Sequence, residues 1–149
     1  MPRRNNVQGL DALVATLRKL PGELKGNPLR SSLRAGVNVF REDAVRRAPQ
    51  SDLGDQGRLK ANIMTRAVPA KDLPSGSADG QEVFVRQRGG KNAPTNAFYW
   101  RFVEFGTVNQ SAQPFLRPAF ETNGQNAINV FSDTFRRQVD RAVEQAKKR

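Results

Sequence analysis

The chain has 149 residues and a net charge of +11, and it contains neither cysteine nor histidine. Their absence excludes disulfides, thiolate or imidazole metal sites, and nucleophiles activated by a histidine. No apolar run is long enough to cross a membrane, and the basic N-terminal flank is not followed by the apolar segment of a signal peptide. The length favours a single domain over residues 1–149.

The first predicted element is a helix over about residues 9–20. Asp11 suits the positive end of its dipole, and Pro21-Gly22 stops it. A short strand is predicted at Val7, before this helix. The apolar positions recur with helical spacing at Leu10, Leu13, Val14, Leu17 and Leu20.

A long helix is predicted over about residues 28–48, because Pro28 can open it and Pro49 must end it. Three arginines, Arg30, Arg34 and Arg41, lie within about 40° of one another on the flank of its apolar stripe. These arginines form either a solvated face or a basic face that meets an acidic neighbour. The stripe itself consists of Leu29, Leu33, Val37, Phe40 and Ala44.

The middle of the chain predicts a small antiparallel sheet. Residues 58–68 indicate a helical turn that leads into a strand from Ile63, and residues 81–88 alternate apolar and polar side chains like a second strand. The loops 69–80 and 89–96 are rich in glycine, proline and polar residues, which predicts flexible segments that are either functional or disordered. The fold class is therefore α+β, with long helices packed on the sheet.

The aromatic residues gather between Tyr99 and Phe120. Residues 97–105 fit both helical and strand periods, and we predict a helical turn at 97–101 that leads into a short strand. Gly106 is predicted to take a positive φ, and Pro118 to occupy the first position of a final helix over about 118–146. The apolar stripe of that helix is Ala127, Phe131, Phe135, Ala142 and Ala146.

The sequence predicts no catalytic, cofactor-binding or metal-binding residues, and hence no enzyme. Glu42 and Asp43 point to different faces of a helix, and the 14 acidic residues are dispersed. The positive charge favours an acidic partner, either nucleic acid or protein, although it also serves solubility. The aromatic residues around Arg101 are either a base-stacking platform or part of the core.

Two motifs carry a resemblance to a known family: EFGT at Glu104–Thr107 and QPFLRPA at Gln113–Ala119. With VQGL at Val7–Leu10, Ala48-Pro49 at the end of the long helix, and GRL at Gly57–Leu59, the sequence resembles the tail-completion, or tail-component, family of long non-contractile-tailed (lambda-like) bacteriophages. The insertion at 89–96 departs from the family pattern.

The resemblance implies a structural virion protein at the neck of the phage, present in the host cytoplasm during assembly. Such a protein is expected to form a ring, a hexamer, around the DNA channel. It would join the tail tube or tail terminator protein to the head-completion or connector protein, with no membrane and no cofactor. Alternatives are a tail terminator or a basic DNA-binding or packaging protein. The interface candidates are Tyr99, Glu104, Phe105, Gly106, Thr107, Pro114, Phe115, Arg117 and Pro118.

Within this set we predict a structural joint between the two motifs. Its aromatic side chains point inward, and Pro114 and Pro118 direct the last helix. Glu104 pairs with Arg117, within one subunit or between two.

Overall fold

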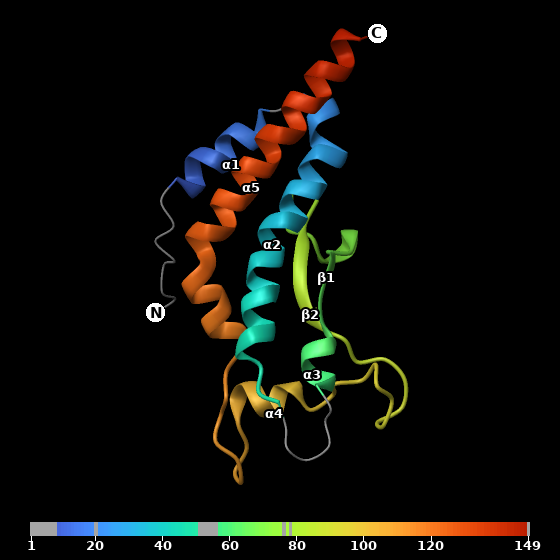
Figure 1. Ribbon diagram of the computed structural model, residues 1–149, viewed down its shortest axis with the longest axis vertical. Coiled ribbons are helices and arrows are strands. Elements are labelled where there is room, and N and C mark those ends of the chain that lie inside the picture. Colours follow the sequence, from blue (N-terminus) through green and yellow to red (C-terminus); the bar gives the residue numbers. More distant parts are fainter. Residues whose placement is uncertain (1–8, 20, 51–56, 76, 78, 149) are drawn as a thin grey trace.

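The structure, a computed structural model, describes residues 9–19, 21–50, 57–75, 77 and 79–148. Two long helices run beside each other, and a two-stranded sheet lies against one of them (Figure 1). The predicted α+β class is confirmed. The elements are α1 (Leu10–Arg18), α2 (Asn27–Arg47), α3 (Arg58–Ala61), β1 (Ile63–Ala67), β2 (Gln81–Val85), α4 (Trp100–Phe105) and α5 (Leu116–Lys147), with 3-10 turns at Gly22–Lys25 and Ala70–Asp72.

The two long helices and the shorter N-terminal helix that were predicted are present, and their ends agree with the prediction to within about two residues. Pro28 lies in the first turn of α2. N–H groups in this turn make no hydrogen bond inside the helix, so the absence of an N–H in proline costs nothing there. Pro118 is the third residue of α5 and not the first, which the same argument allows. The strand predicted at Val7 and most of the loop before α3 lie outside the described residues.

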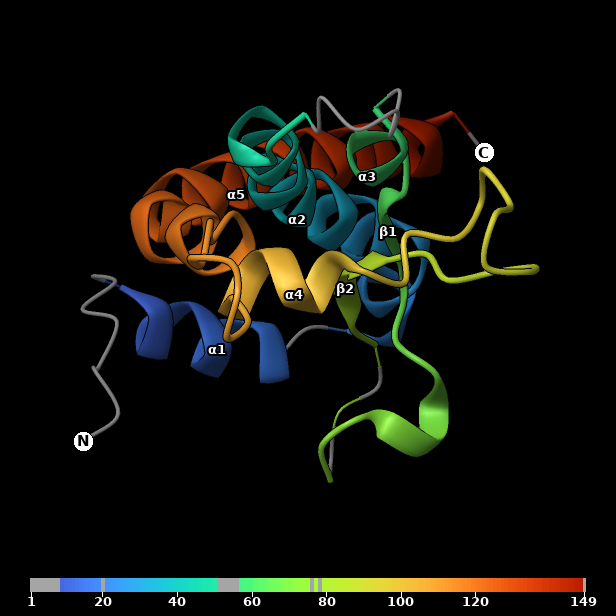
Figure 2. The same ribbon diagram turned by 90° about the horizontal axis from the view of Figure 1, so that it is seen from below.

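The sheet is antiparallel, with Ile63 opposite Val85 and Ala67 opposite Gln81. One face packs on α2: Thr65 Oγ1 donates to Asn38 Oδ1 over 3.2 Å across this contact. Seen from the α4 end, the α2–α5 pair lies on one side of α4 and α1 on the other (Figure 2).

Small side chains bring α2 and α5 together. Ser32 and Gly36 are buried on α2, and a Cβ added at Gly36 would lie 3.0 Å from the Ala127 carbonyl oxygen and 3.2 Å from Phe131 Cβ. The predicted apolar stripe of α2 is therefore only partly right, because Ala44 is its only buried member in the described part. A helix held between a sheet and a second helix uses its smallest residues where the backbones approach most closely.

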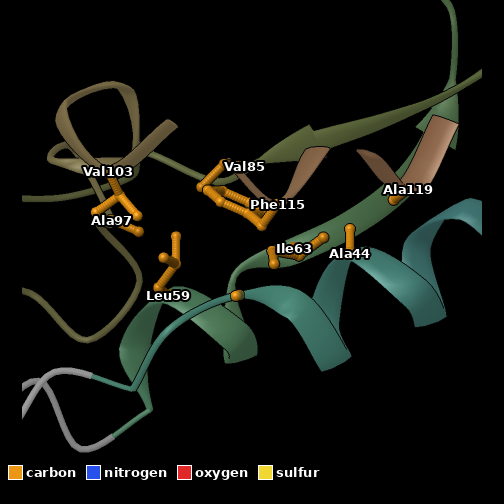
Figure 3. Packing of buried hydrophobic residues seen from close by; sticks show 9 residues of the cluster. Ala44, Leu59, Ile63, Val85, Ala97, Val103, Phe115 and Ala119 are labelled. Atoms are coloured by element: carbon orange, nitrogen blue, oxygen red, sulfur yellow. The ribbon is translucent and has the colours of Figure 1, made fainter. Parts of the chain in front are cut away.

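The core lies where α2, the sheet and α4 meet (Figure 3). Phe115, just before α5, is fully buried among Ile63, Val85 and Val103. The remaining buried members of this cluster are Ala44, Ala48, Leu59, Ala97 and Ala119.

The segment before Gly106 differs from the sequence prediction. Trp100–Phe105 is a helix, so the short strand predicted after residue 101 is wrong. The prediction that the aromatic side chains point inward is also wrong in part, because Phe102 is 51% and Phe105 64% exposed. A short helix at the end of the molecule has one face for the core, here occupied by Val103, and leaves the opposite face uncovered.

Candidate functional site: the joint between α4 and α5

A buried carboxylate joins α4 to the start of α5. Glu104, which is 3% exposed, accepts hydrogen bonds from the main-chain N–H groups of Phe115 (2.8 Å) and Leu116 (3.0 Å) at Oε2. Its Oε1 accepts a third from the N–H of Arg117 at 3.0 Å. The first N–H groups of a helix have no partner inside it, and a negative charge is favourable there. Glu104 therefore caps α5 from a different helix.

The predicted pair of side chains, Glu104 with Arg117, is wrong within the chain. Among the described residues no ion pair links the two, and the Arg117 side chain is exposed. The three N–H donors occupy the carboxylate, so the interaction is with the backbone of Arg117 and not with its guanidinium. An exposed arginine at this point is available to a neighbouring molecule.

The loop between the two helices is closed at its base. Gly106 has a φ of +76°, as predicted, and a Cβ there would meet Ala112 N at 2.8 Å. The Gln113 N–H then donates to the Val103 carbonyl over 2.8 Å, which returns the chain to α4. Between these points Thr107 N donates to the carbonyl of Gln110 at 2.8 Å, and Pro114 is exposed.

Three apolar side chains are left uncovered at this end of the molecule. Phe102 and Phe105 lie on one face of α4, and Val108, at the tip of the loop, is fully exposed. Figure 1 places α4 and this loop at the end opposite the C-terminus. We call these three residues the apolar end. Exposed apolar side chains at one end of a molecule are candidates for an interaction surface.

The other aromatic residues of the segment belong mainly to the core. Tyr99 and Trp100 are half-buried and pack against it, and the Tyr99 ring meets Phe98 edge-to-face with centroids 5.7 Å apart. The aromatic residues around Arg101 that could have formed a base-stacking platform are Tyr99, Trp100 and Phe102. Of these three, only Phe102 is largely exposed. Most of the ring surface that base stacking would need is therefore not exposed.

The predicted basic face on α2 is not a uniform surface. Arg30 Nε lies 2.7 Å from Asp79 Oδ1, and Arg41 Nε donates to the carbonyl of Ile63 at 3.0 Å. Arg34 is exposed. Arg30 and Arg41 thus hold α2 to the loop after β1 and to the sheet, and of the three arginines only Arg30 has an ion pair with a described residue.

A second polar centre, not predicted from the sequence, joins α2 to α5. Asp43 is 7% exposed and accepts from Arg47 Nε (2.7 Å), Arg46 (3.0 Å) and Asn123 Nδ2 (2.7 Å). The hydrogen bond from Arg47 is the main cause that lowers the pKa of Asp43 from 3.8 to about 2. Arginines three and four residues after an aspartate were the sequence signal for this cluster. The exposed Glu42 beside it takes no part.

This depressed pKa predicts a loss of stability in acid. Because Asp43 binds a proton less readily in the folded state, its contribution is complete above the ordinary pKa of about 4 and falls as the pH drops toward about 2. We expect Asp43→Asn to lower the free energy of unfolding by about 2 kcal/mol at neutral pH. Urea titrations of both proteins across this range test it. If the stability of the variant fell with pH as steeply as that of the wild type, the acid sensitivity would not come from Asp43.

The described residues hold no helix that is long and apolar enough for a membrane span, and no group of three or more acidic residues placed to hold a metal ion. Residues 11–106 match the family model HK97-gp10_like, described as "Bacteriophage HK97-gp10, putative tail-component". The chain belongs to this family. The HK97-gp10-like match includes Glu104 and ends at Gly106, so the start of α5 that Glu104 caps lies beyond it. No curated protein and no solved structure gives a significant match to the chain.

As an HK97-gp10-like tail component, the protein has a structural role in the phage tail and lies in the virion, in contact with other virion proteins. The joint between α4 and α5 fits such a role, because both oxygens of its buried carboxylate help to hold two helices together. The apolar end, next to this joint in the chain, is open to a neighbour.

Proposed function

We propose that the protein forms a ring, a hexamer, at the phage head–tail junction, where it completes the tail and joins it to the head connector around a channel for DNA. The observation that carries this proposal is the apolar end. The side chain of Phe102 is 51% exposed, that of Phe105 is 64% exposed, and that of Val108 is fully exposed. The rest of the chain is strongly charged. Covering these three side chains requires a second molecule.

A ring needs a heterologous interface, in which one patch on each subunit meets a different patch on the next. The apolar end supplies the first patch, and it is held in place by the Glu104 cap and the closed loop base. A patch that is ordered before assembly loses little conformational entropy when the ring forms.

The proposed partners are the tail tube or tail terminator protein on one side of the ring and the head-completion or connector protein on the other. Of the two loops that we propose as their contacts, 89–96 is closed by hydrogen bonds between its own ends. Thr95 Oγ1 donates to the Arg88 carbonyl at 2.7 Å, and Asn96 Nδ2 donates to the Gly89 carbonyl at 3.1 Å. This loop is a preformed surface, which favours binding for the same entropic reason.

The ring is tested with Phe102→Ser combined with Phe105→Ser. We expect the wild-type protein to form one ring species by mass photometry and the double variant to stay monomeric with an unchanged circular dichroism spectrum, because both side chains are exposed. Val143→Ser is the matched control, since Val143 is 47% exposed on α5, away from this end. A monomeric wild type, or a double variant that assembles normally, would refute the proposal.

Its place in the tail is tested by electron microscopy of particles made without the protein. If the protein completes the tail, its loss should give tails of normal length that do not join heads. A tail terminator stops tube growth, so its loss gives tails of excess length. Overlong tails would therefore overturn the proposed role in favour of the terminator.

A further inference from the structure

The edge and outer face of the sheet form a basic groove. It has a volume of about 620 Å³ and is lined by Arg66, residues 83–88, Trp100, Arg101 and Leu116. We call it the arginine groove, because four arginines line it and no acidic residue of the described chain does. It lies beside β2 and α4, and none of the three residues of the apolar end lines it.

Two of the four arginines retain most of their capacity to bind an anion. The charge of Arg66 is paired with Glu82 at the rim, where Arg66 Nε lies 2.6 Å from Glu82 Oε1. Arg86 Nε donates a hydrogen bond to the neutral side-chain amide of Asn62 at 2.8 Å. Arg88 and Arg101 are exposed and have no ion pair with any described residue. The groove therefore presents a positive potential to a carboxylate.

One edge of β2 is free beside this groove. The Arg86 N–H donates to the Asn62 carbonyl over 2.8 Å, which sets the alternation of the antiparallel ladder. By that alternation, Val83 and Val85 direct their main-chain N–H and C=O groups away from β1, and no described residue pairs with them there. An unpaired strand edge is a template for another extended chain.

One buried polar atom of the groove lining, the indole Nε1 of Trp100, has no partner within the described residues. Buried donors are nearly always satisfied, and an unpaired one costs free energy. An occupant with main-chain carbonyl and carboxylate groups brings the kind of acceptor that this indole N–H lacks.

We propose that the arginine groove binds an extended acidic segment of a different virion protein, which adds a strand to the free edge of β2 and places carboxylates beside Arg88 and Arg101. Strand addition uses the free main-chain groups of Val83 and Val85, which a DNA duplex would leave unused. A second copy of this chain is a poor occupant, because its 14 acidic residues are dispersed and do not form an extended acidic segment.

The test uses the full-length protein and a synthetic peptide of about eight residues that alternates glutamate with valine. Trp100 is the only tryptophan, so its fluorescence reports occupation of the groove directly. We expect saturable binding that weakens about tenfold or more in the variant Arg88→Glu with Arg101→Glu. The control, Arg136→Glu with Arg141→Glu, changes the net charge equally at exposed positions of α5 and should change affinity by less than about twofold.

Strand addition is tested separately with a peptide N-methylated at alternate residues, which removes the N–H groups that face β2. We expect this peptide, and a lysine–valine peptide, to lose binding. Equal weakening in both protein variants, full binding of the methylated peptide, or displacement of the peptide by a short DNA duplex would overturn the proposal. The measurement needs no ring, so its failure leaves the proposed junction role untouched, and a monomeric protein can still pass it.

Discussion

Glu104→Ala is expected to lower the free energy of unfolding by about 3–5 kcal/mol, because it leaves three N–H groups at the start of α5 without their charged acceptor. Two of the donors, on Phe115 and Leu116, are buried or half-buried and cannot turn to water without moving the helix. Denaturant titration at fixed protein concentration measures the loss.

Two further variants separate this cap from a general effect of charge. Glu104→Gln keeps one oxygen acceptor and should lose about half as much. Glu42→Ala removes an exposed carboxylate from α2 and should change stability by less than about 0.5 kcal/mol. If Glu104→Ala were as mild as Glu42→Ala, the three hydrogen bonds would not stabilise the joint.

Phe115→Ala should also lower the free energy of unfolding by about 3–5 kcal/mol. Phe115 is fully buried where α2, the sheet and α4 meet, so its removal opens a cavity that no neighbouring helix can close without leaving another contact. The same denaturant titrations measure this loss, and a decrease in the slope would indicate that α5 is already partly unfolded in the native state of the variant.

Phe120→Ala is the matched control, from the same aromatic segment. Phe120 is 39% exposed and stacks on Phe40 with ring centroids 4.5 Å apart, so its loss should cost about 1 kcal/mol. Similar losses for the two variants would contradict the assignment of Phe115 as the central core residue.

The long helices and the hairpin were predictable because each has a single dominant period. The stripe from Ala127 to Phe131 is buried on α5, and the alternation of Val83 and Val85 marks β2. Pro28 and Pro49 set the ends of α2 through local sterics alone. Such signals lie within a few neighbouring residues and need no knowledge of the tertiary structure.

The predictions that were wrong concern contacts between distant segments. Trp100–Phe105 fits two periods, and only the packing of Val103 on the core selects the helix. The close approach of α2 to α5 at Gly36 could not be predicted from hydrophobic periodicity, because glycine carries no apolar side chain. A charge pattern suggested a side-chain partner for Glu104, whereas its partners are N–H groups, which no sequence pattern displays.

The closed base of the 106–113 loop separates what a neighbour sees from what holds the subunit together. The Gln113 N–H is hydrogen-bonded to the Val103 carbonyl, and Glu104 holds the start of α5. A substitution at the tip near Val108 therefore leaves the contacts of the core unchanged. In the proposed ring, substitutions at this tip can therefore change the contact with a neighbouring subunit while the helices stay the same, without a cost in folding.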